Sequence, residues 1–541
     1  GGYNTAIGYN SLSASTTAQY NTGCGQGTLA NNTSGEAGTA VGQGALHNNT
    51  TGSYNTAVGR YALITNTTGE RNTALGMNAL QASTTSSWNT AVGQGALSAN
   101  TTGGKNTAVG TFSLDTNTTG SQNTALGYGA LDANATTSNN TAIGHEALNA
   151  NIAGDNTAVG YQSLKETTTG TRNAALGYEA LEKNTTGNYD SGFGAFALWA
   201  NTTADNNTAV GYNALGANTT GTGNVSVGTN SGVTNTTGDK NTSIGGWSLR
   251  YNTTGDENTA LGYEALEDNT TGDKNTGVGY RAAAAITTGE QNTALGWGAY
   301  DDGNGNYNTA IGALSGTSQT TGNRNTLCGN SAGSGLTTGS DNTFIGFKAG
   351  NATTTADNNT AMGKESLYTN TTSANNCAFG REALYDNTAA SNSAFGYRAL
   401  YENTSGTRNQ AFGLYALYSN TTADDNCAFG YNTLYTNATG TRNTAMGSYA
   451  LDNCDAHDNT VMGYNAMSAS STATQCTIVG STAGDAITTG DQNTAMGYQA
   501  LSGCTTGTQN CMVGSFAGRD CSTGDENTCL GDDAAVELTT G

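Results

Sequence analysis

A regularly spaced set of carboxylates is the first feature of this sequence that could do chemistry. Each member stands 17 residues from the next, and the set comprises Asp239, Asp256, Asp273 and Glu290. If one structural repeat separates them, their side chains form a column, and carboxylate oxygens are the ligands that Ca²⁺ prefers. The alternative is a series of solvated turn residues, since Lys240 and Lys274 follow two of them directly. We favour this alternative and expect no cofactor, with Ca²⁺ at the column as the competing hypothesis.

The ten cysteines could form a disulfide framework. Several of them instead stand where other copies of the repeat carry inward-facing residues, and there Cys serves as a small apolar residue. Only Cys504 and Cys521 occupy the same position in adjacent copies, at a separation that strand spacing would bring within disulfide reach. They are the candidate disulfide.

Catalytic motifs are not found. His47, His145 and His457 lie far apart in the sequence, and no zinc-protease, nucleophile-elbow or phosphate-loop motif occurs. An enzyme brings unlike residues together once, whereas this sequence repeats like residues. We therefore expect no catalysis, and a polysaccharide-degrading β-helix with acidic residues on one face is kept as an alternative.

Tyrosine recurs directly after a glycine in many copies of the repeat. Examples are Tyr128, Tyr161, Tyr178 and Tyr212. The rings could form an exposed aromatic strip that is suited to sugars or surfaces. They could equally cover the glycine corner and pack against one another, and both interpretations stay open.

Composition narrows the class of protein. The net charge of −22 arises from 18 basic and 40 acidic residues, which excludes nucleic acid as the main partner. No run of about 18 apolar residues is present, so no membrane insertion of this segment is expected. A hydrophobic fraction of 35% with 78 Gly is also compatible with an intrinsically disordered chain. Only a regular pattern in the sequence argues against disorder.

That order is a tandem repeat. The string Asn-Thr-Ala-apolar-Gly recurs in 32 copies from Asn4 to Asn527. Of the 31 intervals between successive copies, 27 are 17 residues long and four are 16 residues long. With its Asn as position 0, the consensus is Asn-Thr-Ala-Val-Gly-Tyr-x-Ala-Leu-x-x-Asn-Thr-Thr-Gly-x-x, and position 4 is Gly in every copy. A disordered chain has no reason to keep this phase, whereas a stacked structure does.

One copy predicts one turn of a parallel β-solenoid, or β-roll. Positions 0–4 and 5–9 have strand character and are separated by glycine and Asn-Thr-Thr-Gly turns. Stacked in register about 4.8 Å apart, the 32 rungs give a rod-shaped, all-β array. We expect residues 1–541 to form a single continuous array that is a segment of a longer fibre protein.

Substitutions indicate which positions face the interior. Where a small residue replaces Leu at position 8, an apolar residue often replaces Asn at position 11, as in Ala283 with Ile286 and Gly333 with Leu336. Lost volume is thereby regained, as a close-packed core requires. Three copies lack this exchange, at Gly232, Gly316 and Gly350. We therefore predict that position 11 points inward and that its usual Asn forms a buried ladder.

Two further ladders are predicted. Position 0 supplies one, with Asn55, Asn72, Asn89 and Asn106 as members. Position 3 is expected to complete the core, and it carries Phe379, Phe395, Phe412 and Phe429 in successive copies. Ala at position 2 would then face the opposite side of the strand, where a small residue suits packing against another chain, most simply in a parallel trimer.

These motifs carry a family resemblance. Asn55-Thr-Ala-Val-Gly59 followed by Ala62-Leu63 and Thr67-Thr68-Gly69 resembles the repeats of phage-type tail-fibre proteins. The chain is more loosely similar to the head repeats of trimeric autotransporter adhesins, whose repeat is shorter. The resemblance covers the whole chain and implies a trimeric parallel β-roll that is exposed outside the cell and attaches to a surface.

The sequence thus predicts a structural fibre shaft or surface adhesin, located extracellularly, on a cell surface or on a virion. The expected partners are copies of the same chain, in a homotrimer or filament, together with a cell-surface glycan or receptor. An ice-binding solenoid is the second alternative. It requires Thr-x-Thr on one strand face, whereas the paired threonines at positions 12 and 13 face opposite ways.

Overall fold

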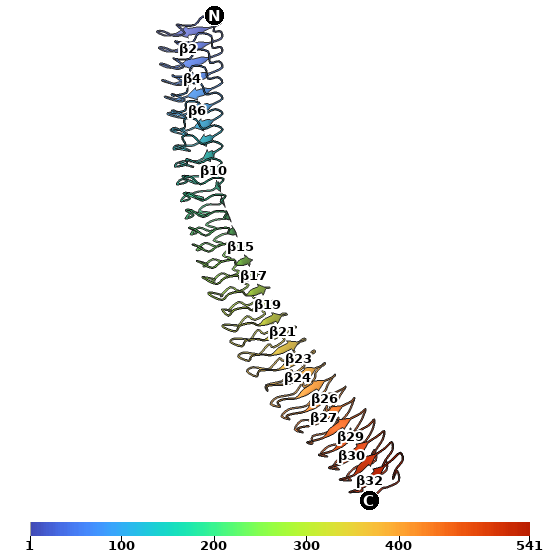
Figure 1. The fold of residues 1–541 in the computed structure, drawn as a ribbon. Helices are drawn as coiled ribbons and strands as arrows, with labels where there is room; N and C mark the ends of the chain where they lie inside the picture. The colour runs from blue at the N-terminus through green and yellow to red at the C-terminus, as the bar shows by residue number, and fades with distance from the viewer. Residues whose placement is uncertain (1, 541) are drawn as a thin grey trace. The chain divides into compact units, whose positions relative to one another are not determined.

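The structure is a computed structural model that describes residues 2–540, and it is an all-β parallel β-solenoid. Each repeat forms one rung with one short strand, and the described residues contain no helix. This arrangement confirms the predicted fold class. Two compact units are present, Gly1–Lys274 and Asn275–Gly541. Within each unit the strands stack in chain order (Figure 1).

The strands of the first unit are β1 (Thr5–Ile7), β2 (Thr22–Cys24), β3 (Thr39–Val41), β4 (Thr56–Val58), β5 (Thr73–Leu75), β6 (Thr90–Val92), β7 (Thr107–Val109), β8 (Thr124–Leu126), β9 (Thr141–Ile143), β10 (Thr157–Val159), β11 (Ala174–Leu176), β12 (Ser191–Phe193), β13 (Thr208–Val210), β14 (Val225–Val227), β15 (Thr242–Ile244) and β16 (Thr259–Leu261).

The strands of the second unit are β17 (Thr276–Val278), β18 (Thr293–Leu295), β19 (Thr309–Ile311), β20 (Thr326–Cys328), β21 (Thr343–Ile345), β22 (Thr360–Met362), β23 (Cys377–Phe379), β24 (Ser393–Phe395), β25 (Gln410–Phe412), β26 (Cys427–Phe429), β27 (Thr444–Met446), β28 (Thr460–Met462), β29 (Thr477–Val479), β30 (Thr494–Met496), β31 (Cys511–Val513) and β32 (Thr528–Leu530).

Equal positions of the repeat lie directly over one another. Strand β3 pairs with β4 in parallel, with Ala40 opposite Ala57. The 16-residue rungs keep this register, because β9 pairs with β10 with Ala142 opposite Ala158. The missing residue is therefore absorbed outside the strand.

The prediction of a second strand at positions 5–9 is wrong. The backbone there alternates into the left-handed region, with φ of 61° at Tyr61 and 51° at Leu63. This curl turns the chain around the coil and buries two adjacent side chains, Ala62 and Leu63, which the period of two in an extended strand could not do. Backbone bonds still join the rungs, since the N–H of Leu63 donates to the carbonyl of Ala79 at 3.0 Å.

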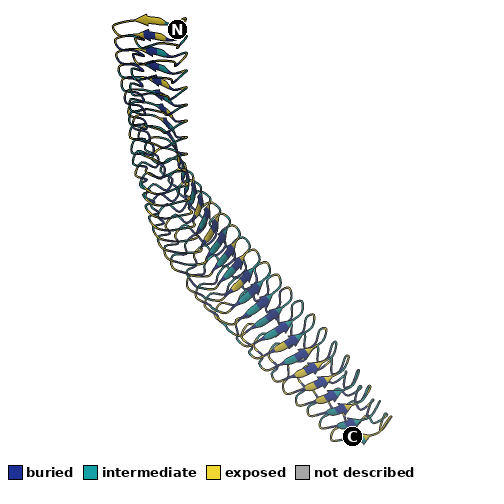
Figure 2. Cartoon of the chain, turned by 45° about the horizontal axis from the view of Figure 1, so that its top comes forward, coloured by how far each residue is buried: buried dark blue, intermediate teal, exposed yellow. Residues whose placement is uncertain are grey.

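The predicted facing of positions 2 and 3 is also wrong. Ala57 and Ala74 at position 2 are fully buried, whereas position 3 faces outward and Leu75 keeps 47% of its surface exposed. Figure 2 shows the buried middle residue of the strands in dark blue, with more exposed neighbours. The reason is the alternation of side chains along a strand. Asn at position 0 points inward, so the side chain two residues later, at position 2, points inward as well. Alanine fits because the coil is too narrow for a larger residue beside Leu at position 8.

Volume exchange inside the coil extends further than predicted. Position 11 is buried in the rungs that carry Ile286 and Leu336, which confirms its inward facing. Two of the unexplained glycines are compensated at position 2 instead. A Cβ on Gly316 would meet Leu327 Cδ1 at 2.6 Å, and one on Gly350 would meet Phe344 Cδ2 at 2.5 Å. The larger side chains occupy the space that Leu at position 8 usually fills.

Two buried amide ladders connect the rungs, as predicted. At position 0 the backbone N–H of Asn72 donates to Asn55 Oδ1 at 2.9 Å, and the contact repeats from Asn72 to Asn89 and from Asn89 to Asn106. The side-chain amide of Asn72 also donates to the carbonyl of Ser86 at 2.8 Å, across the same coil. At position 11, Asn66 Nδ2 donates to Asn49 Oδ1 at 2.7 Å.

Replacing Gly38 with asparagine is expected to repair a gap in the position 0 ladder. The backbone N–H of Gly38 donates the usual bond to Asn21 Oδ1 at 2.7 Å, but Gly38 has no side-chain amide to offer to the next rung. An asparagine would supply an acceptor for the N–H of Asn55 and should raise the free energy of unfolding by about 1 kcal/mol. The added Cβ lies 2.8 Å from Asn21 Oδ1, the movable end of a side chain.

Thermal unfolding of the Gly38→Asn and Gly38→Ala variants measures this effect. Alanine adds the Cβ without the amide, so only the asparagine variant should gain the ladder contribution. If both variants are equally stable, the ladder bond contributes nothing at this rung.

Candidate functional surface

The outward side of the strands is the most distinctive surface of each unit. Positions 1 and 3 face outward, as in Thr56 and Val58 of β4, which flank the buried Ala57. Position 3 is apolar in every strand, and no strand contains a charged residue. We call the outward residues at positions 1 and 3 the outer strip, which runs along β1–β16 in the first unit and along β17–β32 in the second.

The outer strip runs along the full set of strands in each unit. Sixteen strands at about 4.8 Å spacing make it about 75 Å long, and two strand residues give it a width of about 7 Å. Each unit thus presents an area on the order of 500 Å², of which the apolar residues at position 3 make up about half.

The predicted phenylalanine ladder exists, but it lies on the outer strip and not in the core. Successive rings of Phe379, Phe395, Phe412 and Phe429 stack with centroids 4.9, 4.6 and 4.4 Å apart. Phe429 keeps 37% of its surface exposed. Offset stacking contributes about 0.5–1.5 kcal/mol per pair, so the ladder stabilises the rungs while leaving one side of the rings open.

The tyrosines after the glycine corner are both exposed and mutually packed. Tyr128, His145, Tyr161 and Tyr178 form a continuous stack with centroid separations of 5.3, 5.4 and 5.1 Å. Tyr212 instead meets Phe196 edge to face at 6.0 Å. The rings therefore pack against one another and also remain exposed, as with Tyr128 at 52% and Tyr178 at 47%.

The predicted carboxylate column accepts hydrogen bonds from the backbone. The N–H of Thr222 donates to Asp239 Oδ1 at 2.6 Å, that of Asp239 to Asp256 at 2.7 Å, and that of Asp256 to Asp273 at 2.8 Å. In the second unit the N–H of Glu290 donates to Asn306 Oδ1 at 2.8 Å. The side chains of Asp239, Asp256 and Asp273 thus each accept a hydrogen bond from the rung before their own.

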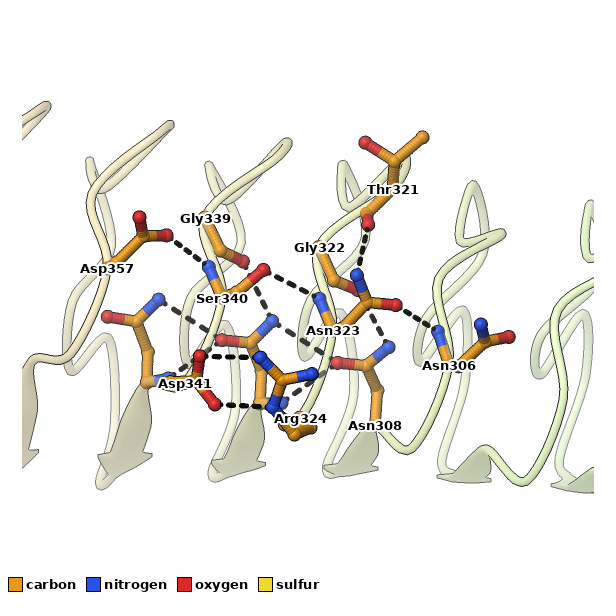
Figure 3. A network of polar contacts seen from close by, with 12 residues as sticks. Asn306, Asn308, Thr321, Gly322, Asn323, Arg324, Gly339, Ser340, Asp341 and Asp357 are labelled. Atoms are coloured by element: carbon orange, nitrogen blue, oxygen red, sulfur yellow. Dashed lines mark hydrogen bonds and ion pairs between the residues drawn. The ribbon is translucent and has the colours of Figure 1, made fainter.

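Neutral residues perform the same task elsewhere. In Figure 3 the N–H of Asn306 donates to Asn323, that of Asn323 to Ser340, and that of Ser340 to Asp357. A position that accepts Asn, Ser and Asp interchangeably needs an acceptor oxygen, not a charge. Among the described residues, no three His, Cys, Asp or Glu side chains are grouped so as to hold a metal ion.

The two cysteines of the candidate disulfide are buried thiols in the structure, not a bridge. Cys504 Sγ donates to the carbonyl of Gly507 at 3.6 Å, and Cys521 Sγ to that of Gly524 at 3.9 Å. The amide of Asn66 makes the equivalent bond to Gly69. Burial raises the pKa of Cys504 to about 12, with Cys521 contributing. Both thiols therefore stand in for asparagine in the position 11 ladder.

The three histidines occupy separate surroundings. His145 belongs to the aromatic stack, His47 Nδ1 donates to the carbonyl of Gly27 at 2.9 Å, and His457 Nδ1 accepts the N–H of Thr441 at 2.9 Å. None of these contacts assembles a nucleophile, a base and an acid.

Exposed arginine–aspartate pairs span successive rungs in the second unit. Arg324 binds Asp341 through two bonds of 2.6 and 2.8 Å (Figure 3). Arg408 with Asp425 and Arg442 with Asp458 repeat this bidentate arrangement. Each guanidinium is thereby matched by one carboxylate.

A scan against models of known protein families finds no match to the chain, and a search of curated proteins finds no matching sequence. The described part of the chain also holds no helix of the length and hydrophobicity that crossing a membrane requires.

Proposed function

We propose that this chain is a structural, non-catalytic rod segment that packs against further copies of itself through the outer strip. In this role it forms the shaft of an extracellular or virion fibre with adhesive use. The single observation that supports the proposal is the column of apolar residues at position 3, on the outward side of strands that contain no charged residue.

The distribution of charge supports self-association at this surface. The sequence has 40 acidic and 18 basic residues, and all of them lie outside the strands. A surface that only faces water has no need to exclude charge, whereas the centre of an interface is depleted of charged residues. The remaining acidic surface would keep assembled rods apart from one another.

The regular repeat favours a second copy as the partner. The outer strip presents one apolar residue per rung, about 4.8 Å apart. A partner matches this spacing along its length only if it has the same rung spacing, and a copy of this chain does. In the proposed homotrimer, the chains therefore contact one another through the residues at position 3. The alanines at position 2, which the sequence had suggested for this contact, are not part of the interface.

Charge introduced on the outer strip should dissociate the assembly. We expect a triple variant with Leu75, Val92 and Val109 changed to lysine to associate at least about tenfold more weakly, because the charges would be buried in the interface. Sedimentation of the purified chain across a range of concentrations measures the effect.

A matched control changes Thr85, Thr102 and Thr119 to lysine. These residues are exposed at position 13 of the same three rungs, and this variant should assemble normally. A wild-type chain that stays monomeric at all concentrations, or two triple variants that behave alike, would contradict self-association through the outer strip.

Ice binding is a second candidate, favoured by one observation. Position 1 is threonine in most strands, and these side chains stand beside the apolar column on the outward side, as Thr73 does beside Leu75. The result is a regular array of hydroxyl and methyl groups. A thermal-hysteresis measurement on the wild-type chain decides this candidate.

A further inference from the structure

Five tyrosines form a second column in the rungs of β22–β26, outside the strands and away from the outer strip. They are Tyr368, Tyr385, Tyr401, Tyr418 and Tyr435, all at position 9. Successive ring centroids lie 5.0, 5.0, 5.2 and 5.1 Å apart, with interplanar angles of 5–11°. All five side chains are partly exposed, and their hydroxyls have no hydrogen-bond partner among the described residues. The column is therefore a row of phenol hydroxyls, one per rung.

Two arginines beside this column share one carboxylate. Glu382 is 5% exposed, and its two oxygens accept bonds from Arg381 Nε at 2.7 Å and from Arg398 Nε at 2.6 Å. The side chains of Arg381 and Arg398 remain 54% and 30% exposed. The group thus carries a net positive charge in an acidic protein.

Comparison with the bidentate arginine–aspartate pairs shows which donor groups of Arg381 and Arg398 are unused. Arg442 uses both Nε and Nη2 on Asp458. Arg381 and Arg398 reach Glu382 through Nε only, and within the described residues their Nη groups make no hydrogen bond. The forked donor geometry that binds carboxylate and sulfate in a bidentate manner is therefore available.

Aromatic contacts fix these guanidinium groups next to the tyrosine column. Arg398 lies 5.2 Å from the ring centroid of Tyr397 and 5.0 Å from that of Tyr401, and Arg381 lies 5.6 Å from Tyr397. We call Arg381, Tyr397, Arg398 and the five-tyrosine column the Tyr–Arg patch. Tyrosine and arginine are the residues that dominate binding hot spots.

Acidic side chains limit where an anion can bind. Asp386 and Glu402 lie close enough to Tyr401 and Tyr418 to influence them electrostatically. Glu365 likewise acts on Tyr385, so positive charge is available only at the two guanidinium groups themselves. A ligand that fits must place its anion there and neutral polar groups along the tyrosines.

We propose that the Tyr–Arg patch binds an acidic polysaccharide, with a carboxylate or sulfate on Arg381 and Arg398 and sugar hydroxyls along the tyrosine column. A polysaccharide repeats its hydroxyls once per sugar, as the column repeats its phenols once per rung. A phosphopeptide offers one anion without the repeated hydroxyls that the tyrosine column would bind. This proposal rests on the adhesive part of the proposed function and gives it a site.

Binding of the whole chain to polygalacturonate, dextran sulfate and neutral dextran tests the proposal. We expect one or both acidic polymers to bind, neutral dextran not to bind, and Arg398→Gln to weaken binding about tenfold through loss of a charge-assisted contact. Tyr418→Phe, which removes one hydroxyl, should weaken binding about twofold. The two acidic polymers distinguish carboxylate from sulfate recognition.

Arg442→Gln is the matched control, because it removes an exposed arginine of a bidentate pair in the same unit and should leave binding unchanged. Thermal unfolding of each variant verifies the fold. The proposal is overturned if neutral dextran binds equally well, if both arginine variants lose binding equally, or if neither acidic polymer binds. Self-association is measured separately by sedimentation, so a failure of this proposal is distinguishable from a failure of the rod assembly.

Discussion

Replacing Gly245 with alanine is expected to break the solenoid at β15. Gly245 has φ of +137°, and an added Cβ would lie 2.3 Å from the carbonyl oxygen of Gly262 and 2.6 Å from its carbon. Both are backbone atoms of the next rung, so relief requires separating the two rungs. Backbone strain and overpacking together should lower the free energy of unfolding by about 3 kcal/mol or more.

The neighbouring Gly246 provides a matched control. Its backbone is not in the left-handed region, and a Cβ there would approach only the edge of the Tyr263 ring, at 3.3 Å. Gly246→Ala should therefore change the free energy of unfolding by no more than about 0.5 kcal/mol. Denaturant unfolding and hydrogen exchange of β14–β16 measure both variants. Equal stability of the two would refute the close rung contact at position 4.

The strict period of the sequence was enough to predict the solenoid, because only a stacked coil requires equal residues at equal intervals. It was also enough to predict the ladders of Asn72 and Asn66, since a buried amide can bond to its copy above and below. The facing of the strand was not predicted correctly. Val58 is the more apolar residue and Ala57 the smaller, so hydrophobicity alone places Val58 inside.

The missing information was the width of the coil. Asn55 is buried two positions before Ala57, and strand alternation from it would have placed Ala57 inside. The rungs of Leu327 and Phe344 carried the same signal, since a large residue at position 2 coincides with glycine at position 8. Residues that exchange volume must share the interior.

The candidate sites show what repeat positions can and cannot indicate. The column of Asp239 was interpreted as solvated turn residues, with a cation site as the competing hypothesis, because the sequence lists the carboxylates but not the backbone N–H groups that face them. The Tyr–Arg patch was overlooked, although Glu382 and Arg398 share position 6 in adjacent rungs. Opposite charges at equal positions of neighbouring copies are a detectable signal for such pairs.

Replacing Asp190 with asparagine is expected to stabilise the first unit at neutral and alkaline pH. Asp190 stands at position 0, where its Oδ1 accepts the N–H of Asn207 at 2.9 Å and its Oδ2 accepts Asn201 Nδ2 at 3.0 Å. An asparagine such as Asn173 also donates across its own coil, to the carbonyl of Gly187 at 2.8 Å. An ionised Asp190 has no proton with which to make that bond.

Burial raises the pKa of Asp190 from 3.8 to about 7, against the opposing effect of its hydrogen bonds to Asn207 and Asn201. The unfolded chain releases the proton near pH 4, whereas the folded chain holds it until about pH 7. Stability is therefore lost as the pH rises through this window, and the loss is complete above the folded pKa. A shift of this size corresponds to about 4 kcal/mol.

The Asp190→Asn variant should exceed the wild type by about 4 kcal/mol at pH 8, and the difference should shrink to within about 1 kcal/mol below pH 4. Hydrogen exchange of β11–β13 across this pH range measures it rung by rung. Asp205→Asn removes the same charge from the same rung at a partly exposed position and should show no comparable pH dependence. A parallel response of both variants would mean that net charge, and not the buried carboxylate in the ladder, sets the stability of these rungs.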